Sequence, residues 1–150
     1  MKYTIDININ LPREKVIELF DNQDNLEKWQ CGLESFEHLS GEPGEVGAKS
    51  LIKYNMDKRK IEMTETILKK DLPNEYSFTF EAKGMWNQVD NYFEEIDANT
   101  TRWKSDNEFK GKGILAIMLF LMPGLFKKQS LKFMNNFKAF AEDRPGDIIP

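Results

Sequence analysis

"GILAIMLFLMPGLFKKQSLKFMNNFKAFAE", residues 113–142, contains the change of period that decides the fold. In its second part, apolar residues recur at spacings of three and four while lysines fall between them, which is typical of an amphipathic helix on a core. The recurring positions are Phe126, Ser130, Phe133, Met134, Phe137 and Phe140 or Ala141. We therefore predict a long helix from about Leu125 to Glu142, and we expect Pro123 to kink it or divide it in two.

The first part of this segment is an apolar run from Ile114 to Phe126. It has thirteen residues and is broken by Pro123-Gly124, whereas about 20 apolar residues are needed to span a bilayer. A run of this length is typical of a helix buried inside a protein or lying at an interface. We predict no transmembrane segment.

The N-terminal part predicts one strand followed by two short helices. Residues 3–9 alternate apolar with polar side chains, which gives a strand one dry and one wet face. Leu11-Pro12 then opens a helix whose apolar face lies within 16–20, because proline suits a first helical turn. A second short helix is expected over 25–29.

Between these helices and Gly113, the period of two returns. Strands are expected at 33–40, 48–56, 61–67, 76–83, 86–96 and 101–110. In the last strand, Trp103 and its alternate neighbours face inward, because the other face is wholly charged. The inner face of 86–96 stays undecided, since both of its faces are mixed. One antiparallel sheet covered by a long helix is an α+β architecture.

Composition and charge restrict the number of domains, the kinds of partner and the expected localisation. A chain of 150 residues, 40% hydrophobic and 31% charged, suits one domain over 1–143 with a short tail at 144–150. A net charge of −4 argues against nucleic acid as a partner. The single cysteine, Cys31, forms no internal disulfide, and no secretory signal is recognisable, so we expect a cytoplasmic protein.

This order of elements resembles the START-related superfamily that includes the birch pollen allergen, often called SRPBCC, and within it the bacterial polyketide cyclase/dehydrase-like and lipid-transport-like proteins. The resemblance covers Lys2 to about Glu142. It is carried by Leu11-Pro12 with 16–20, Leu26 with Trp29, the turn 41–47, Leu72-Pro73, Thr101-Arg102 and the closing helix.

The resemblance implies a helix-grip fold, in which a curved antiparallel sheet of about seven strands, in the order β-α-α-β6-α, wraps a long C-terminal helix. Members of the superfamily hold lipids, isoprenoids, polyketides or plant hormones in an apolar cavity between sheet and helix. The apolar run 114–126 would then be shared between the core and the cavity mouth. The alternative is an interior that packs solid, as protein interiors usually do.

A set of inward-facing positions would line such a cavity. They are Ile52, Tyr54, Met63, Glu65, Phe78, Phe80, Asn91, Phe93, Trp103, Ser105, Asn107, Met118, Met122, Phe126, Phe133 and Phe137. Glu65 is the one candidate catalytic residue, because a carboxylate in an apolar cavity has a raised pKa and can act as an acid, a base or a hydrogen-bond anchor. A bulge that turns Glu65 outward, or a hydroxyl that satisfies it, is the structural alternative.

The chain contains few residues of the types that usually bind zinc. His38 and Cys31 are the only histidine and the only cysteine, and a tetrahedral zinc site needs several such groups. No nucleophile elbow, zinc-protease motif or pair of closely spaced cysteines is present. We predict no metal and no other cofactor.

Three functions stay open. The first is non-catalytic binding or transport of a small hydrophobic ligand, such as a lipid, an isoprenoid or a polyketide-like molecule. The second is a cyclase or dehydratase that uses Glu65 with Asn91 or Asn107. The third is a protein partner-binding module of the heat-shock-activator or ribosome-associated type. Transient contact with a membrane surface through Lys127, Lys128 and Lys132 is a further expectation, although a solvated helix face explains these lysines equally well.

Overall fold

The computed structural model describes all residues from Met1 to Pro150, and its centre is one antiparallel sheet. The strands are β1 (Lys2–Ile9), β2 (Leu33–Ser40), β3 (Lys49–Met56), β4 (Arg59–Asp71), β5 (Glu75–Ala82), β6 (Met85–Asp97) and β7 (Thr100–Gly111). Their spatial order is β1-β7-β6-β5-β4-β3-β2, so that β1 and β2 form the two edges. The strands predicted from alternation are confirmed, with ends that differ by a few residues.

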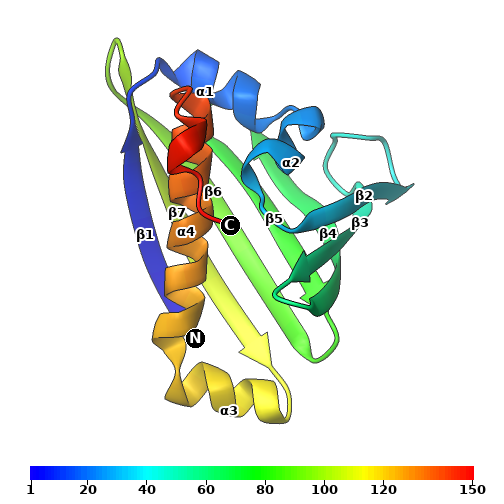
Figure 1. Ribbon diagram of the computed structural model, residues 1–150. Helices are drawn as coiled ribbons and strands as arrows, with labels where there is room; N and C mark the ends of the chain where they lie inside the picture. Colours follow the sequence, from blue (N-terminus) through cyan, green and yellow to red (C-terminus); the bar gives the residue numbers. More distant parts are fainter.

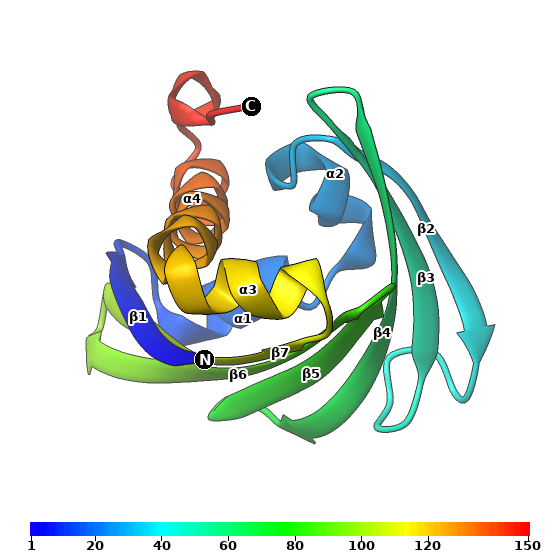
Figure 2. The ribbon, with the colours of Figure 1, turned by 90° about the horizontal axis from the view of Figure 1, so that it is seen from below.

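Four helices accompany the sheet (Figure 1). They are α1 (Arg13–Phe20), α2 (Leu26–Trp29), α3 (Ile114–Leu121) and α4 (Pro123–Ala141). The sheet curves strongly, and α4 lies on its concave side near β1, while β2, β3 and β4 bend round towards the other side of the interior (Figure 2). This arrangement confirms the predicted helix-grip fold.

The C-terminal helix is divided at Met122, and α3 and α4 meet at a bend of 83°. Proline is the first residue of α4, where its missing N–H costs no hydrogen bond, and its ring would clash within a continuous helix. The prediction that Pro123 divides the helix is therefore confirmed. No single helix is both long and apolar enough to cross a bilayer, and only the bent pair of α3 and α4 meets those two criteria together.

Aromatic rings pack the end of the interior that lies beside α1; α1 is at the top of Figure 1. Phe137 of α4 is fully buried, and its ring centroid lies 5.2 Å from that of Trp29 and 5.4 Å from that of Trp103. Phe20 of α1 lies 5.6 Å from Phe137 and 5.2 Å from Phe93. Phe93, Trp103 and Phe137, which the sequence predicts to line a cavity, are buried among these rings at the end of the sheet that α1 and α2 cover.

The C-terminal tail folds back onto α4. Asn136 of α4 is buried, and its side-chain amide exchanges two hydrogen bonds with the backbone of Ile149, at 2.8 Å and 2.9 Å. The Nζ atom of Lys132 donates to the carbonyl oxygen of Pro150 at 2.6 Å. Residues 144–150 are thus ordered against the outer side of α4.

Candidate ligand-binding face

Burial changes along the concave face of the sheet. Near α1, the residues paired across β5, β6, β7 and β1 are all buried, and they are Tyr76, Asn91, Ser105 and Ile5. Nearer α3, a second row of paired residues crosses β3 to β7, and we call it the Glu65 row: Ser50, Glu65, Phe80, Asn87 and Phe109. Ser50 is buried, but the other four side chains are only half-buried. We call these two regions the closed end and the open end of the concave face.

Glu65 lies on the concave face, as alternation predicts. It pairs with buried Ser50 on one side and with Phe80 on the other. The bulge in β4 falls after Ile67 and therefore leaves the facing of Glu65 unchanged. No side chain or backbone group of the protein donates a hydrogen bond to its carboxylate, and no ion pair forms with it. Burial raises the pKa of Glu65 to about 7.

Tyr54 of β3 lies beside this carboxylate. Burial, and then the negative charge of Glu65, raise the pKa of the Tyr54 phenol. The phenol donates a hydrogen bond to Oε1 of Gln30 at 2.6 Å, so its proton is already engaged. The expected alternative, in which a local hydroxyl donates a hydrogen bond to Glu65, is therefore not met by Tyr54.

The amides expected to work with Glu65 are engaged elsewhere. Asn91 donates to the carbonyl oxygen of Tyr76 at 3.1 Å and accepts from Nε1 of Trp103 at 2.9 Å. Asn107 donates to Oγ of Ser105 at 3.0 Å. All these side chains are buried at or next to the closed end, so they hold the strands and the tryptophan rather than facing a ligand.

We expect Asn91→Ala to lower the free energy of unfolding by about 1–3 kcal/mol, because it leaves the indole N–H of Trp103 buried without an acceptor. Chemical denaturation measures this difference. Asn55→Ala is the matched control on an exposed position of β3, and it should change stability by less than about 0.5 kcal/mol. Equal effects of the two changes would mean that the Asn91 hydrogen bonds are replaceable by water.

Asn87 is the amide that sequence reasoning missed. It lies in the Glu65 row, next to Phe80, and its Nδ2 atom donates to the carbonyl oxygen of Glu108 at 3.0 Å. No protein group donates to its side-chain oxygen. The signal that identifies it is the two-residue hairpin loop at 83–84, because counting outward from that loop places Asn87 opposite Phe80 on the inner face.

Two predicted residues of α4 border the open end. The ring of Phe126 lies 5.2 Å from Phe109, and the ring of Phe133 lies 6.4 Å from Tyr54. Both phenylalanines are half-buried. Together with Met63 on β4, they give the open end walls that are mainly aromatic and apolar.

The remaining predicted residues are spread between these regions. Ile52 is buried on β3, and Phe78 is half-buried between the two ends, with its ring 4.4 Å from Tyr76. Met118 is half-buried on α3, whereas Met122 is exposed at the junction of α3 and α4. The apolar run was expected to be shared between the core and the cavity mouth. The outer side of α3 does not pack in the core and is exposed, because α3 projects beyond the end of β7.

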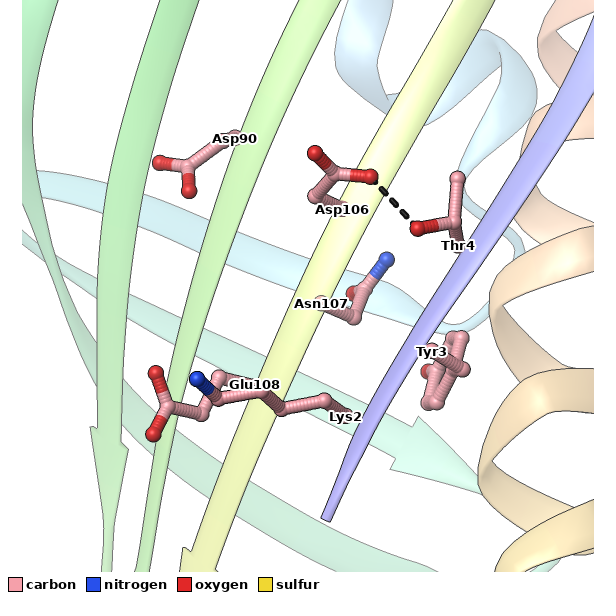
Figure 3. Close-up of a pocket in the computed structure, with 7 residues that line it drawn as sticks. All are labelled: Lys2, Tyr3, Thr4, Asp90, Asp106, Asn107 and Glu108. Atoms are coloured by element: carbon pink, nitrogen blue, oxygen red, sulfur yellow. Dashed lines mark hydrogen bonds between the residues drawn. The ribbon is translucent and has the colours of Figure 1, made fainter.

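A separate hollow lies on the outer side of the sheet, between β1, β7 and β6 (Figure 3). It is lined by Lys2, Tyr3, Thr4, Asp90, Asp106, Asn107 and Glu108. Its floor is polar, and Oδ1 of Asp106 accepts a hydrogen bond from Thr4 at 2.6 Å. No group of three or more His, Cys, Asp or Glu side chains is arranged to hold a metal ion, here or elsewhere in the chain. This hollow has the wrong character for an apolar ligand.

Comparison with known proteins supports the fold independently. No protein-family model and no curated protein matches the sequence. Among solved structures, a conserved protein from Geobacillus kaustophilus is 16% identical, with a TM-score of 0.81 over 95% of this chain and 96% of that one. An aromatase/cyclase from Streptomyces is 12% identical, with a TM-score of 0.76 over 96% and 94% of the two chains.

A third solved structure is norcoclaurine synthase from Thalictrum flavum in complex with dopamine and hydroxybenzaldehyde. It is 12% identical, with a TM-score of 0.73 over 95% of this chain and 87% of that one. Identities this low establish shared architecture and leave activity open. The chain therefore shares its fold, a helix-grip fold, with these three proteins.

Proposed function

We propose that this protein binds or transports a small hydrophobic molecule, without catalysis, at the open end of the concave face between the sheet and α4. The observation that carries the proposal is the gradient of burial along that face. Aromatic rings fill the closed end, whereas Phe80, Phe109, Phe126 and Phe133 stay half-buried around the open end. A small molecule that covers these rings would gain the free energy of apolar burial that the protein alone leaves unused.

The polar groups of the open end restrict the kind of ligand. Glu65 and the side-chain oxygen of Asn87 have no donor within the protein. Because its pKa is about 7, Glu65 is present in both protonation states near neutral pH and can either donate or accept a hydrogen bond. A mainly apolar molecule with one hydroxyl, carbonyl or amine group fits this combination. Lipids, isoprenoids and polyketide-like molecules include such compounds.

A cyclase or dehydratase-like enzyme is the second candidate. The observation that favours it is the unpaired carboxylate of Glu65, whose pKa lies near the operating pH of a general acid or base. The amide that would act with Glu65 is Asn87, because Asn87 lies in the Glu65 row and the predicted partners Asn91 and Asn107 do not. Product analysis with polyketide-like substrates separates the two functions, since Glu65→Gln should abolish turnover by an enzyme while leaving ligand affinity within about ten-fold.

We expect an apolar ligand to raise the midpoint of thermal unfolding in a dose-dependent way. At a free concentration of about 100 times Kd the stabilisation is about 2.7 kcal/mol, which for this size corresponds to a shift of about 5–10 °C. Fatty acids, isoprenoid quinones and an apolar fluorophore are suitable test compounds. The absence of a shift with any of them would favour the third function, a protein partner-binding module.

A matched pair of variants on β4 tests the location. Met63→Gln places an amide in the wall of the open end and should weaken binding by about ten-fold, because the amide loses water when the ligand covers it. Leu68→Gln makes a similar change at a position that is 45% exposed. If both variants bind like the wild type, the ligand lies elsewhere.

A further inference from the structure

The outer side of α3 exposes a continuous apolar surface. Its four residues, which we call the α3 face, are Ile114, Ile117, Phe120 and Leu121. Phe120 is 83% exposed, Ile114 is 73% exposed and Leu121 is 67% exposed. The surface continues through Met122 and Leu125 at the start of α4, which are also exposed. A helix that is apolar all round is normally covered on every side, so the bare α3 face calls for a partner.

The protein holds α3 in place by its opposite side. Leu119 is buried, and a Cβ atom added to Gly111 of β7 would lie 3.0 Å from its Cδ1 atom. Leu115 approaches the turn between β5 and β6, where a Cβ atom on Gly84 would lie 3.4 Å from it. Glycine at these positions lets the helix pack closely on the end of the sheet. The α3 face is therefore presented at a fixed position at the lower end of the molecule (Figure 1).

Positive charge surrounds this face. From Gly111 to Ala141 the chain has five lysines and no acidic residue, although its net charge is −4. Lys112 precedes α3, and Lys127 and Lys128 follow it; all three are exposed and none forms an ion pair. Lys83, on the turn beside Leu115, is also exposed and unpaired. Four exposed lysines without ion pairs thus lie next to the α3 face of a protein whose net charge is negative.

We propose that the α3 face docks on the surface of a bilayer that contains anionic phospholipids. Eight helical residues are ~12 Å long, which is too short to cross a hydrocarbon core of ~30 Å but suits a helix lying within the interface. The bend of 83° then lets α3 lie flat while α4 rises away from the membrane. The surrounding lysines reach the headgroups, where each basic residue strengthens binding.

Charge also argues against a second copy of this chain as the partner. In a symmetric contact through the α3 face, Lys112, Lys127 and Lys128 of the two copies would approach one another, and like charges would oppose association.

Docking on lipid places the open end of the concave face close to the bilayer, because Phe109 of the Glu65 row and Gly111 next to α3 lie on the same end of β7. The docking itself does not require the proposed ligand.

Co-sedimentation with vesicles tests the proposal on the full chain. The vesicles contain phosphatidylcholine alone or phosphatidylcholine with phosphatidylglycerol. We expect binding to the anionic vesicles at low salt, much weaker binding to the neutral ones, and release as salt screens the lysines. No binding to anionic vesicles at low salt overturns the proposal, whatever the outcome of the ligand titrations.

Two matched pairs of variants locate the contact. Phe120→Asn and Ile117→Asn should each lower the partition coefficient about ten-fold or more, whereas Val46→Asn, at a position 59% exposed compared with 57% for Ile117, should leave it unchanged. The double change Lys127→Gln and Lys128→Gln should lower it by roughly five-fold for each lysine. The control pair is Lys15→Gln with Lys28→Gln, on α1 and α2 at the other end of the molecule (Figure 1).

Two results would overturn the assignment even if vesicles bind. Equal losses in the test and control variants would mean that net charge or general hydrophobicity, rather than the α3 face, causes binding. Light scattering that shows a dimer which Phe120→Asn dissociates, with no effect of that variant on vesicle binding, would assign the α3 face to a second copy.

Discussion

Replacing Phe137 by alanine should lower the free energy of unfolding by about 3–5 kcal/mol, the usual cost of truncating a buried phenylalanine. The side chain is completely buried, and its ring lies within 5.6 Å of the rings of Phe20, Trp29 and Trp103. It connects α4 to α1, α2 and the sheet, so the cavity left behind cannot collapse without moving several elements. Denaturant unfolding measures the loss.

Phe133→Ala is the control for this prediction, one helical turn away on α4. Phe133 is half-buried, and its nearest aromatic ring is Tyr54 at 6.4 Å. Only part of its transfer free energy is gained on folding, so we expect a cost of about 1–2 kcal/mol. Because Phe133 borders the open end, this variant should also change ligand binding, which Phe137→Ala should not do directly. Equal stability losses would mean that the two ends of the interior are packed alike.

The period of the sequence was sufficient to predict an antiparallel sheet covered by a long helix, whereas the helix-grip fold itself was implied by the resemblance to the START-related superfamily. Alternation in β7 identified Trp103 as inward-facing, and the change to a spacing of three and four after Gly113 identified α4. Both inferences depend only on the geometry of one element, since a strand repeats every two residues and a helix every 3.6. Pro123 likewise divides the helix through its own ring and missing N–H.

Periodicity could not predict how deeply each inward-facing residue is buried along the concave face. Glu65 and Phe137 both face inward, but alternation does not say that α1 and α2 close one end of the sheet and leave the other open. The facing of Asn87 depends on the pairing of β6 with β5, because the polar residues of β6 occupy both faces. Site residues therefore had to be assigned from the structure, although their inward facing was already evident for most of them.

The exposed α3 face was missed for a similar reason. An apolar run in an otherwise polar chain is usually covered by the rest of the protein. Whether it is covered depends on the length of the neighbouring strand, and β7 ends at Gly111, so only the side of α3 with Leu115 and Leu119 meets the sheet. The same geometry places the α3 face and the open end at one end of the molecule, while the rings that stabilise the fold lie at the other.

Glu65→Gln should stabilise the protein above pH 7 and have little effect near pH 4.5. Burial raises the native pKa of Glu65 to about 7, compared with 4.5 for the free group. Between these values the native state binds more protons than the unfolded state, so the free energy of unfolding falls as pH rises. The full shift corresponds to about 3 kcal/mol at 1.36 kcal/mol per pKa unit. This is an upper value, because water reaches the half-buried side chain.

The difference between variant and wild type isolates this residue, because all other titrating groups are common to both proteins. Denaturant unfolding from pH 4.5 to 8 should therefore show a difference that grows with pH and levels off above 7. Glu62→Gln is the matched control, since it removes an exposed carboxylate from the same strand, and its effect on the free energy of unfolding should be small compared with that of Glu65→Gln above pH 7. A difference for Glu65→Gln that does not change with pH would mean that water hydrates the carboxylate fully. In that case Glu65 would be almost wholly charged at neutral pH and could no longer serve as the acid of the second candidate function.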